Sequence, residues 1–150
     1  DELILQCQES NYLDLNNYDY LWYLQPTSPW REFKMVNDIL FKIKQFLYPN
    51  SLISVKSVPE KFNSEWQYSK DEKGFLYSKE TNIISRRQDL KKKFIRDGRF
   101  YITKTSYIIN KQKLIGKKFV PIILDNYKHV NVDTLDDWFK AKKLCAEYFF

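Results

Sequence analysis

Apolar and polar residues in the first third of the chain follow two different periods. Residues 19–24 form an apolar, aromatic run that is typical of a buried strand. From residue 32 to residue 48 the apolar side chains recur every three or four positions, which predicts an amphipathic helix ended by Pro49. The apolar positions of this helix are Phe33, Val36, Leu40, Ile43 and Leu47.

A second strand is expected directly after this helix. Residues 51–55 form a short run rich in β-branched side chains, which predicts a strand buried on both faces. A strand, a helix and a strand in succession favour a right-handed crossover between parallel strands. Upstream, residues 1–17 indicate the end of a helix and a turn, and we expect a fragment because the chain opens without methionine.

The rest of the chain predicts smaller elements. Residues 56–80 are polar, and we expect a loop there with short antiparallel strands near 66–68 and 74–77. Asp97-Gly98 predicts a turn into a strand at residues 98–103. A short helix at 105–110 and a strand at 119–124 are expected to follow.

The chain ends on a clearer pattern. Residues 129–133 predict a short strand, and Thr134 with Asp137 three positions later resembles a capping box at the start of a helix. The apolar side of that helix would be formed by Leu135, Trp138, Phe139, Ala141, Cys145 and Tyr148.

A rigid turn lies between the first strand and the first helix. Pro26 and Pro29 enclose Thr27-Ser28, and together they hold the backbone out of regular structure. If the turn lies at the carboxyl end of a strand, it is at the edge where open α/β sheets bind ligands. The alternative is a proline-punctuated connection without a binding role.

Composition restricts the class of protein. The chain has 150 residues, of which 43% are hydrophobic and 17% aromatic, which indicates one folded domain with a real core. We expect a soluble, cytoplasmic protein without membrane contact, because no apolar run approaches about 20 residues and no signal-peptide pattern is present. Cys7 and Cys145 are expected to be free, buried thiols, and a disulfide or a metal site is the less favoured alternative. The single histidine, His129, argues against a zinc site.

Positive charge is concentrated in one segment. The net charge is +6, and residues 86–99 supply five of those charges with seven basic and two acidic side chains. The basic residues are Arg86, Arg87, Lys91, Lys92, Lys93, Arg96 and Arg99. The segment could be a solvated face, a nucleic-acid patch or a site for a carboxylate or phosphate. Nucleic acid is the least favoured partner, because no recognition motif accompanies the charges.

Asp133 is a candidate metal ligand. It is expected at the carboxyl end of a strand, where a carboxylate can hold Mg²⁺ together with substrate phosphates. In the alternative interpretation, Asp133, Asp136 and Asp137 only stabilise the amino terminus of the following helix.

Three segments together resemble one enzyme family, the CMP-sialic acid synthetases or acylneuraminate cytidylyltransferases. They are LQPTSPWR (24–31), RRQDLKKKFIRDGRFYIT (86–103) and VNVDTLDDWFKAKKLCAEY (130–148), in the order and spacing of the family. SLISVKSVPE (51–60) fits a strand that the family has between the first two blocks. The resemblance covers essentially all of residues 1–150.

The resemblance implies an α/β fold, namely the Rossmann-like sheet of nucleotide-diphospho-sugar transferases with flanking helices and its amino-terminal part missing. Residues 1–150 would be a partial cytidylyltransferase domain. A segment at about residues 60–100 would protrude, help to form the sugar site and reach over the partner's active site in a homodimer. The implied reaction joins CTP and a nonulosonic acid to give a CMP-sugar and pyrophosphate, with Mg²⁺ as cofactor.

The resemblance also assigns roles to individual residues. Gln25 matches the glutamine that contacts the acylated sugar, and Arg87, in Arg87-Gln88-Asp89-Leu90, matches the arginine that binds the sugar acid. Asp133 matches the second aspartate of the Asp-x-Asp-Thr motif and is the implied catalytic metal ligand. Asn131 replaces the first aspartate and is the second predicted metal ligand, although a neutral amide binds Mg²⁺ more weakly than a carboxylate.

Two further departures from the family are relevant to function. The usual Asn-Gly-Ala turn is Asp97-Gly98-Arg99 here, which we expect to change the charge beside the sugar site. The glycine-rich loop that cradles the CTP phosphates has no counterpart among Gly74, Gly98 and Gly116. Without the first strands of the family's sheet, apolar surface near residues 21–24 should be uncovered.

These observations leave three hypotheses open. The first is a cytidylyltransferase for a sialic-acid-like sugar, present as a fragment that lacks the CTP phosphate loop. The second is a non-catalytic relative that binds a sugar acid or a partner chain, and the third, weaker one is a basic nucleic-acid-binding domain.

Overall fold

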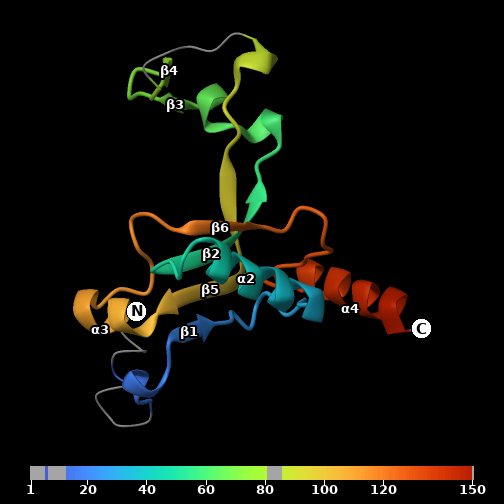
Figure 1. Ribbon diagram of the computed structural model, residues 1–150. Helices are drawn as coiled ribbons and strands as arrows, with labels where there is room; N and C mark the ends of the chain where they lie inside the picture. Colours follow the sequence, from blue (N-terminus) through green and yellow to red (C-terminus); the bar gives the residue numbers. More distant parts are fainter. Residues whose placement is uncertain (1–5, 7–12, 81–85, 150) are drawn as a thin grey trace. The chain divides into compact units, whose positions relative to one another are not determined.

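A computed structural model describes residue 6, residues 13–80 and residues 86–149 of the chain (Figure 1). The chain divides into two compact units. The sheet unit contains residues 1–55 and 96–150, and the inserted unit contains residues 56–95. The protein is a mixed α/β protein with a central mixed sheet and flanking helices, as expected for the coarse fold class.

The sheet has four strands in the order β1-β5-β2-β6. Their bounds are Tyr20–Tyr23 for β1, Ser51–Ser57 for β2, Phe94–Lys104 for β5 and Val120–Ile123 for β6. Strands were therefore correctly predicted at all four places. Strand β1 forms one edge of the sheet, and Tyr23 and Leu24 at its end are exposed, in line with the uncovered apolar surface expected there.

Strand directions explain why the sheet is mixed. Strand β5 is antiparallel to β1, with Tyr20 opposite Lys104, and the amide of Lys104 donates to the carbonyl of Asn50 at the start of β2. Strand β2 is parallel to β6. Strands β1, β2 and β6 therefore point in one direction and β5 in the other. The expected parallel relation of β1 and β2 holds for their directions, but β5 lies between them.

Helix α2 (Phe33–Gln45) covers one face of the sheet. Its buried residues are Met35, Ile39 and Ile43, which pack against residues that include Phe100 and Ile122. The predicted helix is present, but of the five apolar positions on which it was predicted only Ile43 is buried. The helix has two neighbouring apolar stripes, and periodicity alone does not reveal which one the sheet covers.

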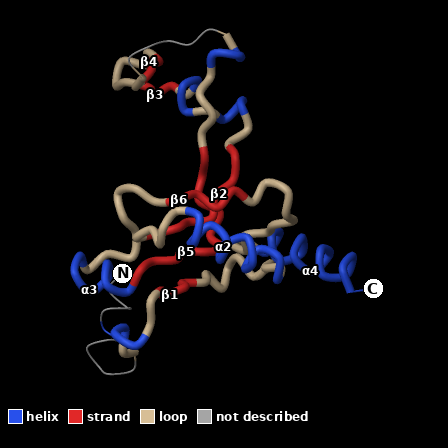
Figure 2. The backbone as a smooth tube through the Cα atoms, viewed as in Figure 1, coloured by secondary structure: helices blue, strands red, loops and turns tan. Residues whose placement is uncertain are grey.

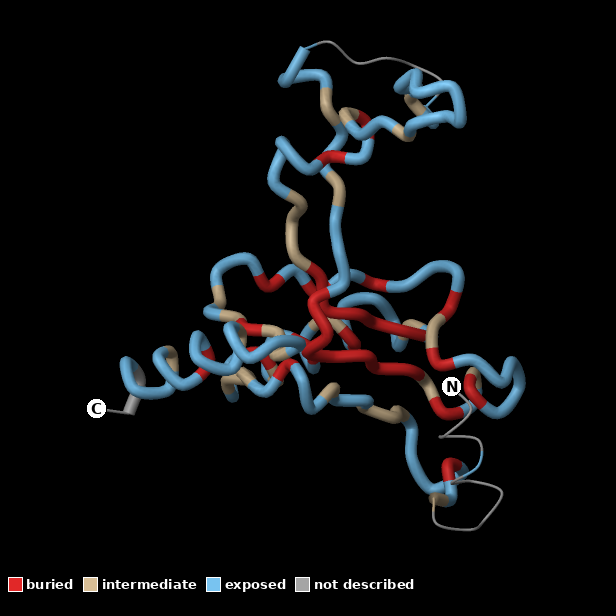
Figure 3. The backbone as a smooth tube through the Cα atoms, turned by 180° about the vertical axis from the view of Figure 1, so that it is seen from behind, coloured by how far each residue is buried: buried red, intermediate tan, exposed pale blue. Residues whose placement is uncertain are grey.

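The opposite face of the sheet is covered by helix α3 (Thr105–Lys111) and by the 3₁₀ turn Leu15–Asn17. Ile108 and Leu15 from these elements pack against the second core cluster of the sheet. Figure 2 shows helices α2, α3 and α4 around the sheet, and Figure 3 shows that the buried residues concentrate along its strands. The helix end expected within residues 1–17 lies almost entirely outside the described residues, and Cys7 lies wholly outside them. Cys145 is a free thiol as expected, but it is exposed, so the expectation that it is buried was wrong.

The inserted unit has little regular structure. Strands β3 (Tyr68–Lys70) and β4 (Leu76–Ser78) form the antiparallel pair that was predicted, displaced by one or two residues. The described part of this unit also contains 3₁₀ turns at Glu60–Phe62, Ser64–Trp66 and Arg87–Asp89.

The capping box of helix α4 (Leu135–Phe149) is present as predicted. The hydroxyl of Thr134 donates to Asp137 Oδ2 at 2.8 Å, and the amide of Asp137 donates back to that hydroxyl at 3.3 Å. Hydrogen bonds from Lys140 and Thr134 lower the pKa of Asp137 to about 2. The strand expected at residues 129–133 was wrong, because this segment forms no strand.

A buried ion pair lies in the middle of β5. Asp97-Gly98 was expected to form a turn, but it lies inside β5, where Gly98 has a positive φ of 82°. Asp97 and Arg99 lie two positions apart and point the same way, as alternate residues of a strand do. Arg99 Nη2 and Asp97 Oδ2 are 2.6 Å apart, and the side chains are 0% and 1% exposed.

Neighbouring strands complete the hydrogen bonds of this pair. The hydroxyl of Ser54 on β2 donates to the Asp97 carboxylate, and Arg99 Nη2 also donates to the carbonyl of Leu124 at 3.2 Å. Burial alone would raise the pKa of Asp97, but the hydrogen bonds from Ser54 and Arg99 and the charge of Arg99 outweigh it and lower the pKa. The carboxylate is therefore ionised when the protein is folded.

Removing one member of the pair should destabilise the protein more than removing both. We expect Asp97→Ala to lower the free energy of unfolding by about 3–5 kcal/mol, because Arg99 would be a buried charge without its partner. The double variant Asp97→Ala/Arg99→Met should recover part of that loss in urea unfolding experiments. Lys128→Ala, which breaks an exposed pair with Glu147, is the control and should cost less than about 1 kcal/mol. Equal losses for the three variants would contradict the assignment.

The lowered pKa of Asp97 also predicts a pH dependence. Because the carboxyl group has a lower pKa in the folded than in the unfolded state, its contribution is complete above about pH 4 and is lost as the pH falls through the folded value. The difference in unfolding free energy between the natural protein and Asp97→Asn should be constant from about pH 7 to pH 5 and shrink below about pH 4. A difference that does not change at low pH would exclude this linkage.

Candidate functional site

The turn after β1 has a fixed geometry because its backbone is hydrogen-bonded to the rest of the sheet unit. The amide of Ser28 donates to the carbonyl of Gln25 at 3.1 Å, which closes the turn. Arg31 Nη2 donates to the same carbonyl at 2.8 Å, and Arg31 Nε donates to the carbonyl of Arg99 at 3.0 Å. The turn is thus connected directly to the strand that contains the buried ion pair. It lies at the carboxyl end of β1, as predicted.

Ser28 joins this turn to two distant segments of the sequence. It is fully buried, and its hydroxyl lies 2.8 Å from Asn131 Oδ1 and 3.2 Å from the carbonyl oxygen of Asp97. The amide of Val132 donates to the carbonyl of Thr27 at 2.7 Å. Three segments therefore meet at the edge of the sheet where β1 ends. They are the turn after β1, the start of the buried part of β5 and the segment before α4.

Asn131 acts on Asp133 through a direct hydrogen bond. Its side-chain nitrogen donates to the Asp133 carboxylate, while its oxygen faces the hydroxyl of Ser28. Asn131 is half-buried and Asp133 is exposed. A chain of hydrogen bonds thus runs from buried Ser28 to the exposed carboxylate, and it fixes the orientation of Asp133.

A glycine is required beside this chain. A Cβ atom at Gly98 would lie 2.5 Å from Gln25 Oε1 and 2.6 Å from Ser28 Oγ, which is closer than side chains approach each other. Its positive φ is a second reason, since a residue with a Cβ is strained in that conformation. Gly98 therefore lets two polar side chains of the turn approach the backbone of β5.

The same geometry concerns the two predicted metal ligands, Asp133 and Asn131. Among the described residues, no group of three or more histidine, cysteine or acidic side chains is arranged to hold an ion. The oxygen of Asn131 faces Ser28, and its nitrogen faces Asp133. Asn131 is therefore engaged by Ser28 and Asp133, and the metal role of Asn131 and Asp133 stays a prediction.

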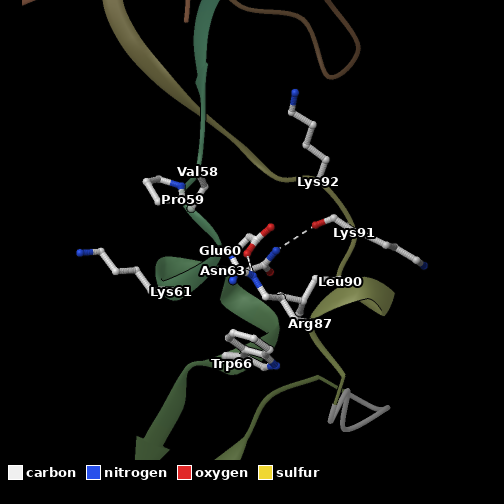
Figure 4. A pocket seen from close by; sticks show the side chains of 10 residues that line it. All are labelled: Val58, Pro59, Glu60, Lys61, Asn63, Trp66, Arg87, Leu90, Lys91 and Lys92. Carbon is white, nitrogen blue, oxygen red and sulfur yellow. Dashed lines mark hydrogen bonds and ion pairs between the residues drawn. The ribbon is translucent and has the colours of Figure 1, made fainter.

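Arg87 belongs to the inserted unit, where it lines a cleft of about 800 Å³ (Figure 4). The guanidinium of Arg87 forms an ion pair with Glu60 inside the cleft. Trp66 and Leu90 supply apolar walls, and the ammonium group of Lys92 points away from the centre. Arg87 and Glu60 are thus the charged groups that meet within the cleft.

The predicted site residues fall into two groups. Gln25, Asn131 and Asp133 lie in the same edge region of the sheet unit, whereas Arg87 lies in the inserted unit. Glu60 and Trp66 were not predicted as neighbours of Arg87, because both are far from it along the chain and local patterns do not reveal contacts between distant segments.

The basic segment is not one exposed patch. Arg99 is fully buried and neutralised by Asp97, so two of its charged residues are removed from the surface. Asp97 and Arg99 compensate each other's charge where they are buried, and the expected change of charge beside a sugar site stays a prediction. Lys93 is also paired, with Glu65 at 3.3 Å.

No protein-family model matches the sequence, and no curated protein is significantly similar to it. No helix in the described part of the chain is both long enough and apolar enough to cross a membrane.

Gly98→Ala tests the close approach at this edge. We expect a loss of about 2 kcal/mol or more in unfolding free energy, from backbone strain and from displacement of Gln25 and Ser28. Gly74→Ala is a matched control, because Gly74 also has a positive φ but its nearest neighbour would be a lysine carbon at 3.7 Å. Urea unfolding of both variants measures the difference, and equal costs would show that the contacts of Gly98 are unimportant.

Proposed function

We propose that the chain is the sugar-binding part of a nucleotidyltransferase that activates a nonulosonic, sialic-acid-like sugar with CTP. The supporting observation is that parts of three blocks resembling the CMP-sialic acid synthetases meet at one sheet edge, through Ser28, Asp97 and Asn131. These blocks are far apart in the sequence. The proposal includes a Rossmann-like nucleotide-diphospho-sugar transferase fold and a homodimer.

The proposed reaction is an in-line displacement. The anomeric hydroxyl of the sugar attacks the α-phosphorus of CTP, pyrophosphate leaves with the electrons of the broken bond, and the hydroxyl proton passes to solvent or to a base. Catalysis then depends on positioning the reactants and on neutralising charge on the triphosphate. The chain contributes mainly to the first of these.

Each site residue has a defined part in this proposal. The side-chain amide of Gln25, beside Gly98, would hydrogen-bond the acyl group of the sugar. Arg87 would bind the sugar carboxylate through two parallel N–H donors, with Glu60 giving up the guanidinium when the substrate enters. Trp66 offers an apolar wall for a sugar ring in the same cleft.

Asp133 would hold Mg²⁺, and Asn131 would keep its carboxylate oriented. When bound, Mg²⁺ would neutralise negative charge on the phosphates of CTP. One carboxylate is compatible with such a site, because Mg²⁺ commonly binds through one or two carboxylates together with substrate phosphates.

A second candidate is a non-catalytic homologue that binds a sugar acid. It is favoured by the neutral Asn131 in the position of a family aspartate and by the lack of a glycine-rich phosphate loop among the 150 residues. Both candidates use Arg87 and Gln25, and they differ in whether CTP is consumed.

Arg87→Ala should weaken the binding of N-acetylneuraminic acid by about tenfold or more, because a charge-assisted bidentate contact is lost. Isothermal titration calorimetry measures the affinity. Arg86→Ala is the matched control: it removes the same charge from the neighbouring exposed residue, which does not line the cleft, and it should leave the affinity nearly unchanged. Equal effects of the two variants would remove Arg87 from the site.

Release of pyrophosphate from CTP distinguishes the two candidates. The protein, with any residues encoded upstream of Asp1 included, is incubated with CTP, Mg²⁺ and several nonulosonic acids, and pyrophosphate is measured with a coupled assay. Release that depends on the sugar supports the enzyme, and its loss in Asp133→Ala supports the metal role. Binding of the sugar without release supports the non-catalytic homologue.

A further inference from the structure

The turn that follows helix α2 presents large apolar side chains to solvent. Phe46, Leu47 and Tyr48 are 48%, 85% and 56% exposed. Leu47 and Tyr48 have positive φ angles of 51° and 59°. Positions with this conformation at the end of a helix usually hold glycine or asparagine, because a larger side chain is strained there. Strain and apolar exposure in the same turn indicate that its side chains have a binding role.

The backbone of this turn is already hydrogen-bonded within the chain. The amides of Phe46, Leu47 and Tyr48 donate to carbonyl groups in the last turns of α2, at 3.0, 3.1 and 2.9 Å. Backbone donors with partners of their own enter a medium without water at little cost, whereas unpaired donors do not. The turn is therefore suited to burial in an apolar phase that offers no hydrogen bonds.

Positive charge accompanies the turn. Lys42 and Lys44 precede it in α2, and Lys42 Nζ lies 5.9 Å from the centre of the Phe46 ring. Residues 104–124 include five lysines and no acidic residue, and four of these lysines are exposed. Neither these five lysines nor Lys42 and Lys44 form an ion pair with a described residue.

The lysines and the turn lie at the same end of the sheet, where β1, β2 and β6 begin. The amide of Lys104 donates to the carbonyl of Asn50 at 2.9 Å, two residues after the turn. A Cβ atom at Gly116 would lie 3.2 Å from Ser51 Oγ, so the loop between α3 and β6 passes directly beside the start of β2. Figure 1 shows this loop at that end of the sheet. We call the surface formed by residues 42–48 and 104–118 the basic end.

Acidic residues do not neutralise the basic end. The described ones nearby include Asp14, whose carboxylate accepts hydrogen bonds from the side chains of Asn16 and Asn17, and Asp19, which directly precedes β1. The lysines outnumber them. An apolar turn among unpaired lysines matches a partner that has an apolar interior and an anionic surface.

We propose that the basic end binds the surface of an anionic lipid bilayer. Leu47 enters the acyl chains, the rings of Phe46 and Tyr48 lie at the interface, and the lysines contact the headgroups. A nucleic acid would also attract the lysines, but Leu47, the most exposed of the three, has no ring on which a base could stack.

The proposal differs from the expectation of a protein without membrane contact, which rested on the lack of a long apolar run. Contact with a membrane surface needs no spanning helix. The basic end lies where β1 begins, whereas Gln25 and Asp133 lie beyond the end of β1. The proposal therefore does not rest on the proposed function.

Vesicle sedimentation tests the binding. The natural protein should pellet with vesicles of phosphatidylcholine and phosphatidylserine, and far less with phosphatidylcholine alone or at high salt. Leu47→Glu should weaken binding by about tenfold or more, because a carboxylate does not enter the acyl chains. Leu135→Glu is the matched control: it makes the same change at a leucine that is 76% exposed on α4, and it should leave binding nearly unchanged. No binding to the anionic vesicles, or equal losses in the two variants, would overturn the proposal.

Charge reversal tests the role of the lysines. Lys117→Glu/Lys118→Glu should weaken vesicle binding by about tenfold or more. Lys70→Glu/Lys73→Glu, which changes the net charge equally but lies in the inserted unit, should have little effect. Equal effects of the two double variants would overturn the assignment of the basic end. Tighter binding to a single-stranded oligonucleotide than to anionic vesicles at the same salt concentration would identify nucleic acid as the partner and overturn the proposal.

A fluorescent label tests whether the turn enters the bilayer. In a Cys7→Ser/Cys145→Ser background, Leu47→Cys and Leu135→Cys each provide one thiol for a dye whose emission depends on polarity. Anionic vesicles should shift the emission from position 47 to shorter wavelength and leave that from position 135 unchanged. No shift at position 47, or equal shifts at both positions, would overturn the insertion of the turn.

Discussion

The buried pair of Asp97 and Arg99 is the interaction on which the rest of the sheet unit depends. Two opposite charges without exposure to water are tolerated only when their hydrogen bonds are also satisfied. Ser54 on β2 and the carbonyl after β6 supply those bonds, so the pair connects three neighbouring strands. Arg31 extends the connection to the turn after β1. A single pair of residues therefore fixes how the strands and the candidate site are arranged relative to one another.

The geometry of the candidate site depends on the buried ion pair of Asp97 and Arg99. Gly98 lies between Asp97 and Arg99 in β5. The ion pair of these two residues therefore also determines where the glycine with the positive φ lies. Gln25 and Ser28 approach the backbone there, and Ser28 connects in turn to Asn131 and Asp133. The exposed polar side chains are hydrogen-bonded to buried ones, which limits their motion. A site that binds selectively needs side chains that are held in this way.

Local patterns in the sequence were enough for the strands of the sheet and for the helices, because a β-branched run such as residues 51–55 favours a buried strand, but they also predicted a strand at residues 129–133 that does not form. They could not reveal that β5 lies between β1 and β2, since strand order depends on contacts between distant segments. Nor could they reveal which stripe of α2 faces the sheet, or that Asp97-Gly98 continues a strand. Asp-Gly usually marks a turn, and here the burial of Asp97 beside Arg99 overrides that preference.

The same pair restricts the chemistry that the edge of the sheet can offer. The opposite charges of Asp97 and Arg99 cancel where they are buried. The polar groups beside Gly98 are then the neutral amide and hydroxyl of Gln25 and Ser28. Such groups select a ligand by the direction of its hydrogen bonds, because neither of them carries a charge that would attract an ion.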